Sequence, residues 1–245
     1  DVMLCLLPLY HVYALVDCFV GPFARGGSFI YQTSLKAPDI MKSLAENPIT
    51  IFPAAPLLWE LFMDGIINRV KGESSFKYRL FTFFLEYGTA MRSMGLAPIV
   101  NRIFSPVHEI FGRSHRFFIS GGAPLKDKYR KYYRSMGFTL VEGYGLSETT
   151  GPICLPDPKR NPVGSVGAVT PGNEIKIINI NEDGIGEVCF RGDSVSPGYL
   201  HNDEANRLSF DSEGYFRTGD LGRLDKKGNL YLTGRIKNVI VLSSG

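Results

Sequence analysis

The chain has 245 residues, of which 44% are hydrophobic and 21% charged, and its net charge is +3. This is the composition of an ordinary globular protein with one large domain or two smaller ones, and it excludes a disordered, collagen-like or low-complexity chain. The four cysteines lie far apart, match no zinc or redox spacing, and fit buried apolar residues in a reducing compartment.

Short apolar runs alternate with amphipathic segments in the first half of the chain. Strands are predicted at 2–9, 28–31, 49–52, 116–120 and 138–141. Helices are predicted at 12–24, 38–46, 56–70, 76–94, 98–111 and 124–136. The run 12–24 is too short to span a bilayer and contains Asp17, so we interpret it as a core helix. The alternation predicts an α/β fold in which a parallel sheet is covered by helices.

After residue 150 the pattern changes to short strands, predicted at 174–180, 186–191 and 229–233 and separated by turn signals. We therefore expect an α/β portion at 1–151 with a helical insert near 76–111, and a smaller, mainly antiparallel β subdomain at 152–233. Because the chain begins without Met and stops in an unfinished loop, we expect an internal piece of a longer protein.

Positive charge is concentrated between Arg69 and Arg134, where thirteen Lys or Arg stand against four Asp or Glu. Phe and Tyr are interleaved with these cations, so the stretch could rest on phospholipid or another anionic partner. A solvated helical face is the other interpretation of the same run. No motif for binding nucleic acid is present.

The stretch LVEGYGLSETTG, residues 140–151, follows a predicted buried strand. Gly143 and Gly145 allow a sharp turn and a close approach of the backbone to a ligand. Tyr144 offers a flat face for stacking on a base, Ser147 offers a hydroxyl to a phosphate, and Glu148 is a carboxylate of the kind that Mg²⁺ accepts. The other interpretation is a polar, glycine-rich loop.

Four further stretches could carry chemistry. FISGGAP, residues 118–124, predicts a strand that turns at two glycines into a helix whose first turn holds Pro124. YFRTGD, residues 215–220, places a carboxylate after a tight turn, where it could accept bonds from two vicinal hydroxyls. GRIK, residues 234–237, and LPLYH, residues 7–11, place basic and imidazole groups at strand ends. The other interpretations are a basic strand end and a structural histidine, which is the commoner role of a lone histidine at such a place.

Taken together and in this order, the motifs LPLYH, SGGAPL, EGYGLSETTG, YFRTGD and GRIKN resemble those of the AMP-forming acyl-CoA synthetases, which belong to the adenylate-forming superfamily. The resemblance covers nearly the whole chain and implies part of that family's large N-terminal domain. The aromatic insert at 76–111, with SGGAPL and RNPVGSVG, looks most like the branch that activates medium- and long-chain fatty acids.

The resemblance implies a reaction in two steps. A carboxylate attacks the α-phosphorus of ATP to give an acyl adenylate and pyrophosphate, and the thiol of coenzyme A then displaces AMP. The implied cofactors and substrates are ATP or AMP, Mg²⁺, coenzyme A and a fatty acid. Ala54, Ala55 and residues near Gly122 would line a tunnel for the acyl chain.

The resemblance also implies the roles of single residues. Tyr144 would stack on adenine, and Asp220 would accept bonds from the ribose with help from Arg235. Glu148 would hold Mg²⁺, and Ser147, where the family usually has Thr, would contact the α-phosphate. The backbone of the nucleotide site would come from Gly121, Gly122, Ala123, Glu142, Gly143 and Gly145. His11 would position or gate the acyl carboxylate and thiol, and Lys237 would be the hinge to a C-terminal domain, within 234–245.

Two departures from the family pattern limit this reading. The phosphate loop that precedes LPLYH and the C-terminal domain with its lysine are absent from the sequence, so we expect the chain alone not to catalyse adenylation. Two alternatives stay open, an acyl-AMP ligase that feeds a carrier protein and a non-catalytic homologue that binds a nucleotide or acyl group. We expect a cytoplasmic protein with peripheral contact to the inner face of a membrane.

Overall fold

The structure, a computed structural model, describes residues 1–112 and 114–236 of the chain. Its packing divides the chain into two units, Asp1–Glu142 and the remainder from Gly143. The division lies upstream of residue 151, where the change to antiparallel strands was expected, because the first strand after Gly143 already pairs in an antiparallel sheet. The proposed assignment of domains stays a prediction.

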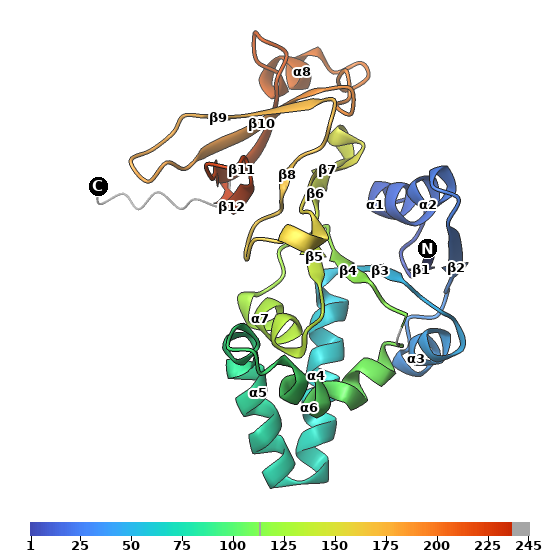
Figure 1. Ribbon diagram of the computed structural model, residues 1–245. Helices are drawn as coiled ribbons and strands as arrows, with labels where there is room; N and C mark the ends of the chain where they lie inside the picture. The colour runs from blue at the N-terminus through green and yellow to red at the C-terminus, as the bar shows by residue number, and fades with distance from the viewer. Residues whose placement is uncertain (113, 237–245) are drawn as a thin grey trace. The chain divides into compact units, whose positions relative to one another are not determined.

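Unit 1 contains a five-stranded sheet in the order β2-β1-β3-β4-β5. Its strands are β1 (Val2–Cys5), β2 (Ser28–Tyr31), β3 (Ile51–Ala54), β4 (Phe117–Ser120) and β5 (Leu140–Glu142). Every pair is parallel, which confirms the predicted parallel sheet covered by helices (Figure 1). The predicted strand 2–9 is too long, because the chain bends after Cys5 toward Pro8, which has no N–H to donate to a ladder.

Helices connect these strands and cover both faces of the sheet. They are α1 (Val12–Ala14), the π-helical η1 (Leu15–Val20), α2 (Gly21–Ala24), α3 (Ala37–Glu46), α4 (Pro56–Glu73), α5 (Ser75–Ser93), α6 (Ala97–Ile110) and α7 (Asp127–Met136). The predicted helix 124–136 starts too early. Lys126 is extended and caps α7, and the buried Leu125 donates its N–H to the Glu142 carboxylate outside any helix, at 3.3 Å.

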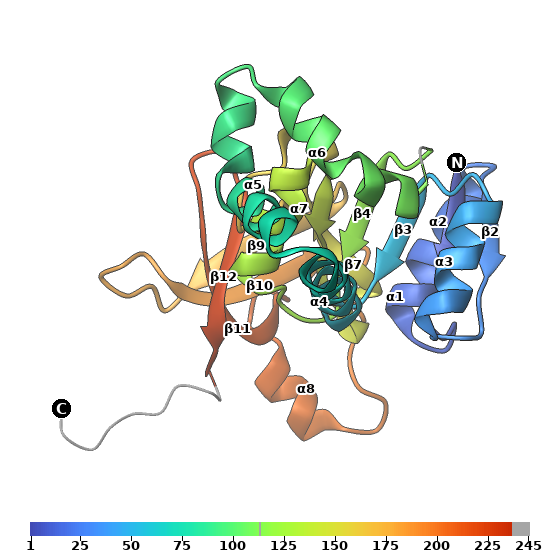
Figure 2. The ribbon, with the colours of Figure 1, turned by 90° about the horizontal axis from the view of Figure 1, so that it is seen from below.

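Alternating strand residues divide the core of unit 1 between the two faces. Leu4, Phe52 and Phe118 belong to the large cluster formed with α3 to α7, and Met3 and Ile51 belong to a smaller cluster with Cys18. This alternation follows from the period of two along a strand. Figures 1 and 2 show how the helices enclose the sheet.

The segment 12–24 covers the sheet with one side only. Its buried residues are Ala14, Cys18 and Pro22, and most of its other side chains are exposed or half-buried. The predicted helix 12–24 is present, as α1, η1 and α2, but it is not buried on all sides, so its interpretation as a core helix is wrong. An apolar run does not by itself show burial on all sides, because apolar side chains also occur on exposed surfaces.

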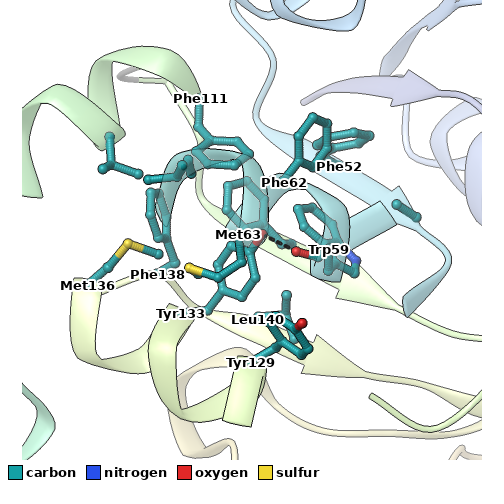
Figure 3. Packing of buried hydrophobic residues seen from close by; sticks show 14 of the residues in the cluster. Phe52, Trp59, Phe62, Met63, Phe111, Tyr129, Tyr133, Met136, Phe138 and Leu140 are labelled. Carbon is teal, nitrogen blue, oxygen red and sulfur yellow. Dashed lines mark hydrogen bonds between the residues drawn. The ribbon is translucent and has the colours of Figure 1, made fainter. Parts of the chain in front are cut away.

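Trp59 of α4 is fully buried in the large cluster, beside Phe52, Phe62 and Tyr133 (Figure 3). Its ring stacks on Phe118 with centroids 4.9 Å apart, and its Nε1 donates to the carbonyl of Ile119 at 3.2 Å. Tyr133 of α7 donates to the backbone carbonyl of Trp59 at 2.9 Å (Figure 3). These bonds satisfy the polar atoms of two buried aromatic side chains, and they tie α4 to β4 and α7 to α4.

Asp17 should make stability depend on pH. Burial raises the pKa of its carboxyl from 3.8 to about 7. Between these values the folded protein holds a proton that the unfolded chain releases, so stability should fall as pH rises through this window. At pH 8, Asp17→Asn should raise the free energy of unfolding by about 1–3 kcal/mol, and at pH 4 it should change little. Urea denaturation at both pH values tests this, with the exposed Asp203→Asn as control, and an equal gain at both would contradict it.

Unit 2 contains two antiparallel sheets. β6 (Tyr144–Leu146), β7 (Gly151–Leu155) and β8 (Ala168–Val169) form one, and β9 (Asn173–Ile178), β10 (Gly186–Gly192), β11 (Phe216–Leu224) and β12 (Leu230–Arg235) form the other, in the order β12-β11-β10-β9. The antiparallel arrangement confirms the predicted β subdomain, and the strands predicted at 174–180, 186–191 and 229–233 are β9, β10 and β12. Four strands, β6, β7, β8 and β11, and the short helix α8 (Asp203–Ser209) were not predicted from the sequence.

The core of unit 2 is small and lies between its strands. It is formed by Ile153, Cys154, Val188, Phe190 and Leu230. All four cysteines of the chain are free and buried, as their spacing predicted. No helix within residues 1–112 and 114–236 is long and apolar enough to cross a membrane.

Candidate functional site

Tyr144 begins β6, directly after the turn at Gly143. Its strand lies so close to β7 that a Cβ on Gly145 would lie 1.8 Å from the carbonyl oxygen of Gly151, so only glycine fits there. The Tyr144 ring lies 6.0 Å from that of Phe190 in the core of unit 2, and its hydroxyl donates to Asp220 Oδ2 at 2.6 Å. The aromatic side chain is thus held by packing on one side and by a hydrogen bond at its tip.

Asp220 lies inside β11, in a bulge rather than after a tight turn as predicted. Cys189 of β10 pairs with Arg217 and Glu187 pairs with Leu221, so β11 carries extra residues between these pairs. Thr218 closes the bulge by donating its Oγ1 to the carbonyl of Val188 at 2.8 Å and accepting the N–H of Asp220 at 3.0 Å. A bulge changes the direction in which a side chain points, here that of Asp220.

The Asp220 carboxylate is 6% exposed and has a partner on each oxygen. Tyr144 donates to Oδ2, and Arg235 of β12 donates its Nε to Oδ1 at 2.5 Å. Burial and the negative charge of Asp220 raise the pKa of Tyr144, so the phenol stays protonated and remains a donor. The hydrogen bond to Asp220 raises the pKa of Arg235. Each carboxylate oxygen can still accept a further bond, which suits a diol.

Ser147 and Glu148 lie in η2 (Ser147–Thr149), a 3₁₀ helix of one turn that follows β6. Thr149 holds this turn, since its Oγ1 accepts the N–H of Leu146 at 2.8 Å and donates to the carbonyl of Gly151 at 2.9 Å. Ser147 is exposed. Glu148 accepts a hydrogen bond from the hydroxyl of Tyr199 at 2.7 Å, a contact that the sequence analysis missed because the two residues are far apart in the chain.

Glu148 fits a metal ion that arrives with a phosphorylated ligand. Among the described residues no group of three His, Cys, Asp or Glu could hold a metal by itself. Mg²⁺ commonly uses one or two carboxylates together with water and substrate phosphates, so a single carboxylate agrees with that mode. The bond to Glu148 raises the pKa of Tyr199, which keeps its hydroxyl a donor and orients the carboxylate.

In unit 1, Gly121 and Gly122 follow β4 as predicted. A Cβ on Gly121 would lie 3.0 Å from Cζ of Tyr13, and Gly122 has a φ of +85°. Tyr13 was not singled out from the sequence. It packs against this bend, and its hydroxyl lies 3.4 Å from the carbonyl of Ile119 and 3.5 Å from that of Ala54. Ala123 is exposed.

His11 caps the helix that follows β1. Its Nδ1 accepts the N–H of Tyr13 at 3.2 Å, so the proton of a neutral imidazole lies on Nε2. The ring is exposed, and its capping contact is one that a residue with a purely structural role would also make. The expected role in positioning acyl carboxylate and thiol stays a prediction.

Glu142 ends β5, and its side chain is engaged within unit 1. Arg130 of α7 donates to both carboxylate oxygens, and Leu125 donates its N–H to one of them. Burial opposes the charge of Arg130, but the hydrogen bonds and charges of Glu142 and Asp127 outweigh it and raise the pKa of Arg130. Any contact of Glu142 and Gly143 with a nucleotide therefore falls to their backbone, and it stays a prediction.

The structure brings together only part of the predicted site. Tyr144, Asp220 and Arg235 are in direct contact within unit 2. Glu148 has Tyr199 as its partner in the same unit. His11, Gly121, Gly122, Ala123 and the Glu142 side chain belong to unit 1, and a single site built from both sets stays a prediction. Lys237 lies outside the described residues.

Ser120 ends β4, immediately before these glycines, and its buried Oγ has no hydrogen-bond partner among the described residues. Ser120→Ala should leave the free energy of unfolding unchanged or raise it by up to about 1 kcal/mol, because it removes an unsatisfied polar atom. The matched control is Ser165→Ala, since Ser165 is equally buried but bonds Leu230 and Gly167 at 2.9 Å. That variant should lose about 1–3 kcal/mol in the same denaturation experiment. Equal losses in both variants would refute the prediction.

Unit 1 is a parallel α/β unit, unit 2 is built of antiparallel sheets, and most of the candidate residues lie at strand ends or in the turns beside them. Residues 1–200 match the model of the family described as AMP-binding enzyme, and the chain belongs to this family. This confirms the resemblance found in the sequence.

Relatives and solved structures agree with this assignment. The chain is 32% identical to the long-chain-fatty-acid–CoA ligase ACSBG1 of Rattus norvegicus over 100% of its own length and 36% of that protein. It is 30% identical to ACSBG2 of Homo sapiens, over 98% of this chain and 38% of that protein. The chain thus spans little more than a third of these relatives. Its fold is similar to that of O-succinylbenzoate coenzyme A synthetase from Bacillus subtilis in complex with ATP and magnesium ion, with a TM-score of 0.71. The two sequences are 24% identical, and the match covers 100% of this chain and 44% of that chain.

Proposed function

We propose that the intact protein is an AMP-forming fatty acid–CoA ligase. It would activate a medium- or long-chain fatty acid with ATP to an acyl adenylate, and transfer the acyl group to coenzyme A. The observation that carries this proposal is the group Tyr144–Asp220–Arg235, where a buried carboxylate is held beside an aromatic ring and a guanidinium. Fatty acid–CoA ligases that are 30–32% identical over nearly all of this chain support the choice of substrate and reaction.

In this proposal the residues of unit 2 bind the nucleoside. Tyr144 offers a ring face to adenine, and Asp220 accepts hydrogen bonds from the vicinal ribose hydroxyls. Arg235 and the Tyr144 hydroxyl hold the carboxylate in place before the ligand binds. Such preorganisation lowers the cost of orienting the α-phosphorus toward the attacking carboxylate.

Glu148 would hold Mg²⁺ together with the phosphates of ATP, with its carboxylate oriented by Tyr199. The ion would offset the negative charge of the triphosphate. Ser147 would donate its hydroxyl to the α-phosphate. Gly121, Gly122, Ala123, Glu142, Gly143 and Gly145 would contribute backbone groups to the nucleotide site, His11 would position the acyl carboxylate and the thiol, and Lys237 would act as the hinge.

The acyl chain would enter a tunnel beside Ala54, Ala55 and Gly122. Each methylene buried there would contribute about 0.8 kcal/mol to binding, so chain length should be discriminated. We also propose that the protein works in the cytoplasm and contacts the inner face of a membrane peripherally.

ATP–pyrophosphate exchange by the intact protein across a series of fatty acids tests the first step. Exchange should peak at one chain length, and Glu148→Ala should reduce it by at least about 100-fold through lost charge stabilisation. Glu182→Ala, in an exposed turn, is the control and should exchange at the wild-type rate. Thioester formed on adding coenzyme A would exclude an acyl-AMP ligase that serves a carrier protein. ATP binding without exchange for any acid would favour the non-catalytic homologue and refute the proposal.

The chain of 245 residues should show no exchange by itself. The chain spans 36–38% of the relatives' length, and it carries neither the phosphate loop nor the C-terminal lysine of the family pattern, which would contact the triphosphate and the acyl carboxylate. The same assay on this chain tests the expectation, and acyl adenylate formed at a measurable rate would contradict it.

A further inference from the structure

An apolar stripe runs along the solvent side of α5. Phe76, Leu80, Phe83 and Tyr87 follow one another at intervals of four, three and four residues, which places them on one face of a helix. Phe76 is 74% exposed, Phe83 50% and Tyr87 57%. A contiguous run of exposed aromatic side chains is unusual on a soluble protein and marks a surface that binds something.

A groove of about 630 Å³ opens beside this stripe, between α4, α5 and α6. Leu80 belongs to both the stripe and the groove, so the two form one continuous surface. Apolar residues line much of the groove, among them Ile66, Val70, Phe81, Ile103, Val107 and Ile110, together with the charged Arg69, Glu73, Lys77 and Glu109. All of them belong to unit 1.

The turn between α4 and α5 adds positive charge to this surface. From Arg69 to Arg79 there are four Lys or Arg and one acidic residue, Glu73. Glu73 pairs with Lys77 at 3.0 Å and lies 3.9 Å from Arg69. Lys71 and Arg79 are exposed and take part in no ion pair among the described residues. Phe76, the second residue of α5, thus lies among an excess of cations along the chain. The turn between α4 and α5 lies at the end of unit 1 farthest from the sheet (Figure 1).

We propose that the α4–α5 hairpin docks on an anionic phospholipid bilayer. The stripe would enter the boundary between headgroups and acyl chains, and the cations of 69–79 would contact the headgroup phosphates. The groove would accept lipid acyl chains beside the stripe. An anionic bilayer accounts for both the apolar stripe and the cations Lys71 and Arg79 beside it. The docking rests on the membrane contact proposed above and identifies its surface, but it does not depend on the adenylation chemistry.

Co-sedimentation of the intact protein with lipid vesicles tests the proposal. Vesicles with about 30 mol% phosphatidylserine should retain the protein at low salt, and pure phosphatidylcholine vesicles should retain it about tenfold less. Phe76→Ser/Phe83→Ser should lower the partition coefficient about tenfold, and Lys71→Gln/Arg79→Gln at least as much. Phe23→Ser, at an equally exposed phenylalanine, and Lys226→Gln/Lys227→Gln should leave it unchanged.

Pyrophosphate exchange without vesicles separates this proposal from the proposed activity. The hairpin variants should exchange at the wild-type rate, and Glu148→Ala should lose exchange but bind vesicles normally. The docking would be overturned if neutral vesicles retained the protein as well as anionic ones do. It would also be overturned if the hairpin variants were retained as well as their control variants. A concentration-dependent dimer in analytical ultracentrifugation that Phe76→Ser/Phe83→Ser abolishes would overturn it in favour of a second copy of the chain.

Discussion

Replacing Asp220 by Ala should weaken the binding of AMP to the intact protein by about 100-fold or more. A ribose diol bound to a carboxylate gains two hydrogen bonds to a charged acceptor, each of which contributes about 1.5–3 kcal/mol. The substitution also leaves the Tyr144 hydroxyl and the Arg235 guanidinium without the acceptor that holds them. Isothermal titration calorimetry with AMP measures the loss.

Two neighbouring variants separate the ribose contact from its support. Tyr144→Phe keeps the ring and removes one donor to Asp220, so it should weaken the binding of AMP by less than about tenfold. Tyr144→Ala removes the stacking surface as well and should cost about 1–3 kcal/mol more. If Asp220→Ala bound AMP as tightly as the wild type while remaining folded, Asp220 would not contact the ribose and the nucleotide site would have to lie elsewhere.

Among the substitutions considered, breaking the ion pair between Arg130 and Glu142 should lower the stability of the protein the most. The side chains are 17% and 11% exposed, so Arg130→Met would leave a buried carboxylate without its partner. Losses of about 3–5 kcal/mol are usual for such a change. For a protein of this size they correspond to a fall in Tm of roughly 6–20 °C. Calorimetry or thermal denaturation followed by circular dichroism measures the shift.

Arg134→Met is the matched control, because Arg134 lies on the same helix but is exposed. It should change stability by less than about 0.5 kcal/mol. Arg130→Met/Glu142→Gln should recover part of the loss by neutralising the orphaned charge. A single Arg130→Met variant as stable as the wild type would mean that the pair does not hold β5 to α7.

The order of strands and helices in unit 1 could be predicted from the sequence because it depends on local patterns. Runs such as 49–52 and 138–141 carry the apolar residues of a buried strand, and amphipathic runs such as 56–70 carry helical spacing. The observed end of an element differs from the predicted one where a long-range contact determines it. The helix predicted to start at Pro124 starts at Asp127, with Lys126 as its cap, because Leu125 donates its N–H to Glu142, seventeen residues further along the chain.

The sequence by itself determined the class of the chain and the side chains that could serve a nucleotide, since Tyr144, Glu148 and Asp220 each carry the required chemistry in a recognisable motif. It could not determine what those side chains contact. The bulge in β11, the bond from Tyr144 to Asp220 and the bond from Tyr199 to Glu148 join residues that lie 30 to 76 positions apart. Only the tertiary structure decided these contacts, because strand register and helix packing, which bring distant residues together, are properties of the whole fold.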